Sequence, residues 1–126
     1  MVFYVPIADT DGVLAALFDA GAGHVGYYDG CAFVAAGTGQ FRPLGSAKPV
    51  IGEVGSLEKV AENRVELTFP RSLREKVVAR LREAHPYEEP AFHVLQNEAD
   101  SPLVEPSPLV EPGPRRRRSR SPCRSQ

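Results

Sequence analysis

The run HPYEEPA at residues 85–91 decides how the second half of the chain folds, because it separates a helical pattern from a short strand pattern. Pro86 disfavours helical geometry at His85 and cannot donate a backbone hydrogen bond, so a helix is expected to end here. Pro90 then leads into a short strand expected over residues 92–95. A histidine, a tyrosine and two carboxylates lie on the turn, which predicts a rigid polar corner and a candidate site.

Two stretches with helical spacing precede this corner. The first helix is expected over about residues 11–20, with N-cap oxygens offered by residues 9–11 and a left-handed end at Gly21. The second begins at a capping box over residues 72–75, in which a serine and a glutamate satisfy each other's backbone donors. The apolar faces are predicted to be Val13, Leu14, Leu17 and Phe18 for the first helix, and Leu73, Val77, Val78, Leu81 and Ala84 for the second.

The strands are read from runs of apolar and β-branched residues. A first strand is expected over residues 2–5, and apolar and polar residues alternate over residues 64–69, which indicates a strand with one buried face. Residues 31–36 and 40–44 look extended, and Gly37-Thr38-Gly39 between them is interpreted as a hairpin turn.

This order predicts an α+β ferredoxin-like sandwich, βαββαβ with an extra hairpin, in which two helices cover one face of a mainly antiparallel sheet. If the other sheet face carries apolar side chains, such as those of Phe3, Val5, Phe33, Val34 and Phe41, a partner must cover it. Because an apolar face must be covered, a closed symmetric oligomer is the expected solution.

Composition and charge limit the classes of protein to which this chain can belong. The 126 residues are 42% hydrophobic and 25% charged, which fits one modest domain. No apolar run approaches the roughly 20 residues that cross a bilayer, and the first residues do not resemble a signal peptide, so we expect a cytoplasmic protein without a membrane partner. Two cysteines, Cys31 and Cys123, are too few and too differently placed for a disulfide framework or a zinc knuckle.

The chain is expected to divide into a domain, residues 1–97, and a disordered proline-rich linker with an arginine-rich tail, residues 98–126. Residues 1–100 carry 9 Lys and Arg against 14 Asp and Glu, whereas residues 101–126 carry 6 Arg against 2 Glu. An acidic domain gains nothing from counterion release, so nucleic-acid binding by the domain is disfavoured. The basic tail is either an extension without a specific function or a weak contact for RNA, a membrane surface or an acidic partner.

Several motifs taken together resemble the inserted domain of the NGG-interacting-factor-three family, also called YqfO, over about residues 2–95. The corner is also similar to the end of the divalent-cation-tolerance protein CutA. The resemblance implies the ferredoxin-like trimeric architecture that CutA shares with the signalling protein PII. The motifs are YVP (4–6), GAGHVG (21–26), YD (28–29), Cys31, GTGQFRP (37–43), IGEVG (51–55) and HPYEEPA (85–91).

The resemblance also implies what this chain lacks. Long members of the family split a dinuclear metal domain around the insert, and the metal ligands belong to the flanking halves. This chain has three histidines, His24, His85 and His93, too few for two histidine-rich metal sites. We therefore expect no catalytic residues, no resident metal ligands and no cofactor, and no serine or cysteine has the context of a nucleophile.

The candidate binding residues come from the YD, GTGQFRP and HPYEEPA motifs, and each has an alternative reading. Tyr28 and Asp29 either line a cleft between subunits or anchor their own loop. His85 with Glu88 suits a divalent ion such as zinc or copper, or else forms a hydrogen-bonded structural corner. The glycines at 37 and 39 either cradle an anion near Arg42 or make an ordinary turn. The full set of predicted ligand-binding residues is Tyr28, Asp29, Thr38, Arg42, His85, Tyr87, Glu88 and Glu89.

The expected function is a non-catalytic regulatory or ligand-binding domain. It would form a homotrimer and bind a small ligand or a divalent metal in grooves between subunits. One alternative is an accessory subunit of a dinuclear-metal hydrolase of the GTP cyclohydrolase type 2 homologue kind. Another is a structural interaction module whose basic tail recruits RNA or an acidic protein.

Overall fold

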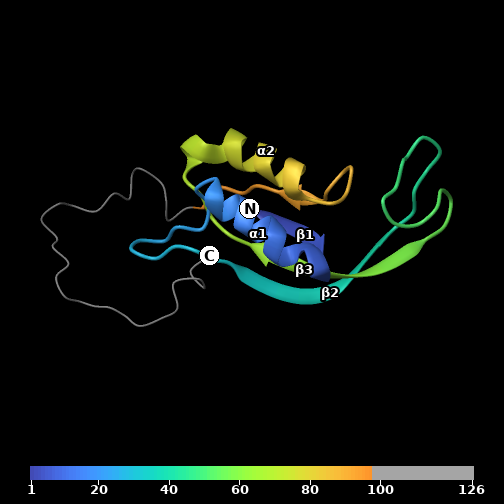
Figure 1. Cartoon of the computed structure of the whole chain (residues 1–126), viewed down its shortest axis with the longest axis horizontal. Coiled ribbons are helices and arrows are strands. Elements are labelled where there is room, and N and C mark those ends of the chain that lie inside the picture. Colours follow the sequence, from blue (N-terminus) through green and yellow to red (C-terminus); the bar gives the residue numbers. More distant parts are fainter. Residues whose placement is uncertain (98–126) are drawn as a thin grey trace, which may run out of the picture.

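A computed structural model describes residues 1–97, and the expected linker and tail lie outside the described residues. The elements follow the order β, α, β, β, α, β (Figure 1). Short 3-10 turns, η1 (Ile7–Asp9) and η2 (Arg71–Leu73), precede the two helices. The strands and helices are β1 (Val2–Pro6), α1 (Thr10–Asp19), β2 (Phe33–Phe41), β3 (Glu58–Glu66), α2 (Arg74–Ala84) and β4 (Phe92–His93).

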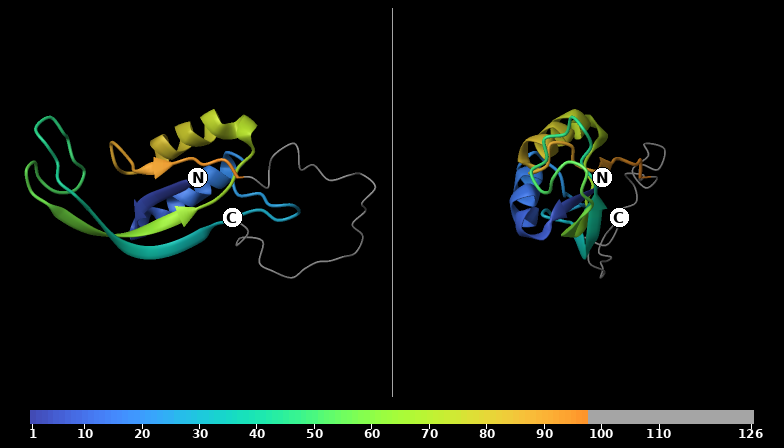
Figure 2. Two further views of the ribbon diagram at one scale, coloured as in Figure 1. Left: turned by 180° about the vertical axis from the view of Figure 1, so that it is seen from behind. Right: turned by 90° about the vertical axis from the view of Figure 1, so that its right-hand side faces the viewer.

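Within the described residues the strands form a four-stranded sheet in the order β2-β3-β1-β4, and every neighbouring pair is antiparallel. Both helices lie on the same face of this sheet (Figure 2). The α+β class and the two helices over an antiparallel sheet are therefore confirmed, and the arrangement is compatible with a ferredoxin-like fold. The opposite sheet face, called the open face below, is not covered by a helix.

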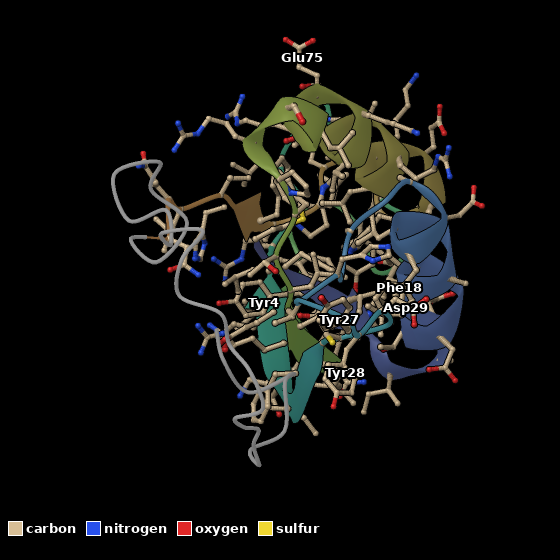
Figure 3. The ribbon with its side chains drawn as sticks, turned by 90° about the vertical axis from the view of Figure 1, so that its left-hand side faces the viewer. Tyr4, Phe18, Tyr27, Tyr28, Asp29 and Glu75 are labelled. Atoms are coloured by element: carbon tan, nitrogen blue, oxygen red, sulfur yellow. The ribbon has the colours of Figure 1, made fainter. Side chains whose placement is uncertain are left out.

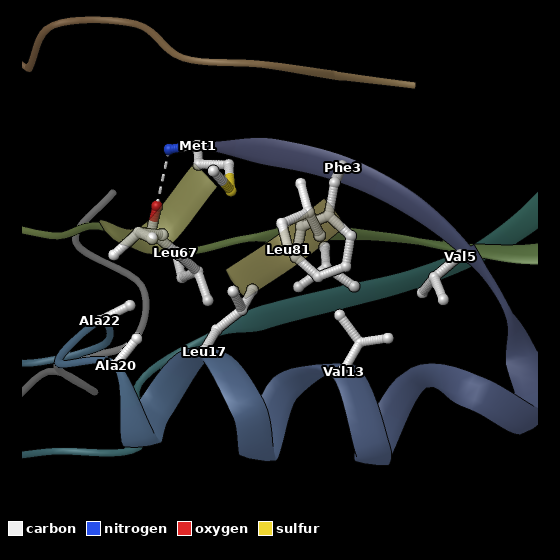
Figure 4. Packing of buried hydrophobic residues seen from close by; sticks show 11 residues of the cluster. Met1, Phe3, Val5, Val13, Leu17, Ala20, Ala22, Leu67 and Leu81 are labelled. Carbon is white, nitrogen blue, oxygen red and sulfur yellow. Dashed lines mark hydrogen bonds between the residues drawn. The ribbon is translucent and has the colours of Figure 1, made fainter. Parts of the chain in front are cut away.

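The core lies between the sheet and the two helices (Figure 4). Phe3 and Val5 alternate along β1 and, with Val65 of β3, meet Leu17 of α1 and Leu81 of α2, all with no exposed surface. Full burial of one such side chain stabilises the fold by about 1.5–3 kcal/mol. Phe3, Val5 and Val34 therefore do not lie on the open face. The pleat of β1 turns Phe3 and Val5 toward the helices, and Val34 lies opposite Val65 on the same side of the sheet.

The predicted hairpin turn at Gly37-Thr38-Gly39 is also wrong. These residues lie in the middle of β2, which pairs with β3 over nine residues from Phe33↔Glu66 to Phe41↔Glu58. A Cβ at Gly39 would collide with the Glu62 carboxylate of β3, so this glycine marks a close approach inside a strand. The connection between β2 and β3 is instead residues 42–57, called the arm below.

Helix ends match the sequence signals unevenly. Gly21 has φ +105°, the left-handed end predicted for α1, and α2 stops at His85 with extended backbone before Pro86. The capping box at 72–75 does not form, because η2 leads directly into α2 and no side chain caps it. No side chain caps α1 either, and the Thr10 hydroxyl donates back to the Pro6 carbonyl at 3.2 Å.

Two strands differ from prediction in their bounds. β3 begins at Glu58 and ends at Glu66, because its ladder with β2 extends toward the arm rather than toward residue 69. β4 is limited to Phe92–His93, opposite Phe3 and Val2 of β1. Just after the end of β3, the Leu67 carbonyl accepts a hydrogen bond from the Met1 amino group at 2.8 Å. This bond holds the start of β1 against the core (Figure 4).

Candidate functional site

The corner after α2 is anchored by His85, which is 5% exposed. Its Nδ1 accepts a hydrogen bond from the Tyr87 backbone N–H at 3.1 Å, so this nitrogen carries no proton. Nε2 must then carry the proton, and it donates to the Tyr4 carbonyl of β1 at 2.6 Å. Both ring nitrogens are occupied by backbone groups, which favours the structural corner over a metal-binding role for His85.

Tyr87 projects from this corner over the open face. Its hydroxyl donates to Glu62 Oε2 at 3.0 Å, and its ring meets Phe41 edge-on at a centroid distance of 5.9 Å. Partial burial raises the pKa of Tyr87 to about 12, and the hydrogen bond to Glu62 and the charges of Glu62 and Asp9 act in the same direction. Tyr87 is therefore a neutral hydrogen-bond donor at physiological pH.

Glu88 ties the corner to the arm. Its carboxylate accepts the backbone N–H of Lys48, with the nitrogen 2.9 Å from Oε1 and 3.4 Å from Oε2. The arm is closed at its base by a hydrogen bond from the Gly55 N–H to the Pro43 carbonyl at 2.7 Å. In Figure 1 the arm reaches away from the helices, and the corner, drawn in orange, lies next to the ends of the strands from which it leaves.

A cavity of about 1090 Å³ lies between the open face, the arm and the corner. Its floor is set by strand alternation, because Tyr4, Glu62 and Arg64 share the face opposite the core side chains of β1 and β3. Its wall includes apolar residues of the arm, such as Leu44, Val50 and Ile51. Of the eight residues predicted from sequence, Thr38, Arg42, Tyr87, Glu88 and Glu89 line this cavity.

The remaining predicted residues lie apart from the cavity. His85 is buried under the corner, as described above. Tyr28 and Asp29 belong to the loop between α1 and β2, where Val25 and Tyr28 form a bridge and both Tyr28 and Asp29 are exposed. Figure 3 shows Tyr27, Tyr28 and Asp29 together at this end of the fold, and the arm leaves from the opposite end in Figure 1.

The lining residues that sequence reasoning missed include Tyr4, Phe41, Glu62 and Arg64. The sequence does contain a signal for Tyr4 and Arg64. Each is next to a core residue of its own strand, so the alternation of side chains places it on the opposite, open face. Glu62 gives no such signal, because residues 58–63 do not alternate cleanly. Its role depends on Gly39 of the neighbouring strand, whose missing side chain leaves room for the carboxylate.

The mixture of groups suits a small organic ligand. Arg42 and Arg64 supply positive charge, Glu62, Glu88 and Glu89 supply negative charge, and the arm supplies apolar surface. Pockets that bind small molecules combine a mostly apolar lining with a few placed polar groups in this way. Residues 1–97 contain no group of three or more His, Cys, Asp or Glu side chains placed to hold a metal ion. In the same range, no helix combines the length and apolarity needed to cross a bilayer.

Comparison with known proteins shows that the chain is similar to one part of several longer proteins. No protein-family model matches it. It is 53% identical over 94 residues to a GTP cyclohydrolase 1 type 2 homolog of Mycobacterium bovis, covering 75% of this chain and 25% of the relative. The homolog of Bacillus subtilis with the same name is 49% identical over 94 residues, with the same coverage of both chains.

One solved structure agrees with these relatives. A Bacillus cereus protein related to NIF3 superposes with a TM-score of 0.61 and 44% identity, covering 71% of this chain and 22% of that chain. The chain thus spans about a quarter of the length of the relatives it matches. Together the matches support the NIF3 (YqfO) family for this chain.

Proposed function

We propose that this chain is a non-catalytic regulatory or ligand-binding domain of the NGG-interacting-factor-three (YqfO) family, and that a small ligand occupies the cavity over its open face. The cavity carries the proposal, because it is lined by five of the eight predicted residues, two from the GTGQFRP motif and three from the HPYEEPA motif. The nearest lining residues of the two motifs, Arg42 and Tyr87, are 45 positions apart in sequence. They meet because the Tyr87 ring contacts Phe41 and the Glu88 carboxylate accepts the Lys48 backbone N–H.

The proposed assembly is a homotrimer of the PII and CutA type, in which neighbouring subunits close the cavity into a groove. Support comes from the open face, which exposes apolar surface such as Phe33, 49% exposed, beside the cavity-lining side chains. The arm adds exposed Leu44 and Val50 at 70% and 62%. Apolar surface of this kind is typical of contacts between chains.

A divalent metal is the alternative occupant. The structure offers Glu88 and Glu89 at the cavity, while His85 has both ring nitrogens hydrogen-bonded to backbone. A metal would therefore need carboxylate ligands from this chain and further ligands from a neighbouring subunit. The cavity's mixture of cationic and apolar groups favours the small organic ligand.

The proposed regulation works through the arm. The Lys48 amide bound to Glu88 holds the arm to the corner on one side of the cavity. A ligand in the cavity would contact both, and so would stabilise one arrangement of the arm. For the ligand to change the affinity for a partner, it must bind that arrangement more tightly than the others.

Native mass spectrometry with ATP, GTP, zinc chloride and manganese chloride, offered singly, tests the proposal. We expect a number of subunits divisible by three, with one probe per subunit, and we expect Arg42→Glu to abolish binding of the anionic probes. Arg71→Glu is the matched control, because it reverses an exposed arginine in η2 outside the cavity lining. A monomer that takes up none of the probes, or binding that survives Arg42→Glu and Tyr87→Ala, would count against the proposal.

A second candidate rests on the names of the relatives, which are GTP cyclohydrolase 1 type 2 homologs. In this proposal the chain is an accessory part of a dinuclear-metal hydrolase whose metal ligands lie outside it. Metal analysis and a GTP turnover assay of the chain, purified from cells together with any protein that binds it, separate the two candidates. Zinc or manganese retained with turnover would favour the hydrolase, and its absence together with ligand uptake would favour the regulatory domain.

A further inference from the structure

Strand β2 lies at one edge of the sheet and has unusual composition for an edge. In the part of the chain that the structure describes, β2 pairs only with β3, so its outer edge has no strand neighbour. It is nine residues long, FVAAGTGQF, with no charged residue and no proline. Proteins usually protect an exposed edge with charge, proline, a bulge or a very short strand, and β4 at the other edge is only two residues long.

We propose that β2 pairs antiparallel with β2 of a second copy of this chain, about a two-fold axis at Gly37. The sequence of the strand fits this register, because Phe33 and Phe41 lie four residues on either side of Gly37. The axis therefore sets each Phe33 opposite the partner's Phe41, with the small residues Ala35, Gly37 and Gly39 between them on the same face. Aromatic pairs across antiparallel strands each contribute about 0.2–1 kcal/mol.

The surroundings of β2 leave room for this pairing. Val34, on the helix side, is 42% exposed, and Ala36 and Thr38 are also exposed, so neither helix overhangs the edge. Figure 1 shows β2 as the outermost element of the fold, on the far side of the sheet from α2. A Cβ at Gly37 would have no atom within 4 Å, so the centre of the edge is open.

The proposed pairing of two β2 strands would also extend the wall of the cavity. Phe33, Ala35, Gly37, Gly39 and Phe41 share the open face of β2, and Phe41 lines the cavity. The partner's Phe33 would stand beside Phe41 and extend the cavity wall across the junction. The inference goes beyond the proposed function, because it concerns the strand edge and holds whether or not the open face is covered by other subunits.

Subunit counting tests the pairing through Gly37→Lys, which adds a charge at the axis without straining the monomer. Native mass spectrometry of the full chain is expected to give an even number of subunits, which is six where the proposed trimer also forms, and Gly37→Lys is expected to halve it. Gly12→Lys is the matched control, because Gly12 of α1 also has open space for a side chain, and it should leave the number unchanged. A monomer, an odd number of subunits, or a number that Gly37→Lys does not alter would overturn the inference.

A cross-link tests the register. In a Cys123→Ser background, Gly37→Cys should form a disulfide-linked dimer on mild oxidation, because opposed residues of antiparallel strands have Cα atoms about 4.5–5.5 Å apart. Ala35→Cys is the control on the same face. In the proposed register it lies opposite the partner's Gly39, about 13 Å along the strand from the partner's residue 35, and should not cross-link. Equal cross-linking of both variants, or of neither, would overturn the register.

Discussion

The hydroxyl of Tyr87 donates a hydrogen bond to Glu62 Oε2 across 3.0 Å, joining the corner after α2 to the middle of β3. The two residues are 25 positions apart in sequence, and they meet on the open face beside Gly39. The bond closes one side of the cavity. It also links the ionisation of Tyr87 to the stability of the fold.

Stability is predicted to fall in alkali through Tyr87. Its pKa is raised to about 12 in the folded protein, above the usual value near 10, so folding favours the neutral hydroxyl. The stabilisation is fully present below about pH 10 and is lost as the pH rises through about 12. Tyrosinate absorbance should show a late-titrating component that is absent from Tyr87→Phe. If both proteins give the same titration curve, Tyr87 does not interact with Glu62 in this way.

Gly39→Ala is predicted to disturb Tyr87 rather than the core. The new Cβ would collide with the Glu62 carboxylate, which is the far end of a flexible side chain and can move away. Its movement breaks the bond to Tyr87, at a cost of about 0.5–1.5 kcal/mol. The pKa of Tyr87 should fall toward its usual value. Gly37→Ala, where the added Cβ meets open space, is the matched control and should leave the titration unchanged.

His85 is predicted to be a stability residue. His85→Ala removes the donor to the Tyr4 carbonyl and the acceptor for the Tyr87 N–H, both in a largely buried setting. Leaving such groups unsatisfied costs about 1–3 kcal/mol, which urea unfolding would detect. His93→Ala, which changes an exposed histidine of β4, should alter the unfolding free energy by about 0.5 kcal/mol or less. Equal effects of the two substitutions would contradict the anchoring role.

The parts of this fold that could be predicted from sequence are those with a local physical cause. Pro86 ends α2, Gly21 ends α1 in left-handed backbone, and the alternation of Val65 and Leu67 places both in the core. Glycines 37 and 39 misled the prediction, because a pair of glycines suits a tight turn as well as a strand in close contact with its neighbour.

The candidate site was less predictable because it is built from contacts between distant segments. Lys48 and Glu88 are 40 positions apart, and no spacing pattern indicates that the arm folds back to the corner. The motifs predict that Tyr28 and Asp29 bind ligand together with the corner, yet the fold places them on a separate loop. Their role in binding stays a prediction.

Glu88→Ala is predicted to release the arm, because the Glu88 carboxylate accepts the Lys48 N–H at 2.9 Å. Hydrogen exchange measured by NMR should show the Lys48 amide exchanging several-fold faster, since an exposed hydrogen bond contributes about 1 kcal/mol. Global stability should change little, because neither residue packs in the core. Glu89→Ala is the matched control: it removes the same charge from the next position, which is also exposed and lines the same cavity. If Glu89→Ala accelerates exchange at Lys48 as much as Glu88→Ala does, loss of charge rather than loss of this hydrogen bond frees the arm, and Glu88 does not tether it.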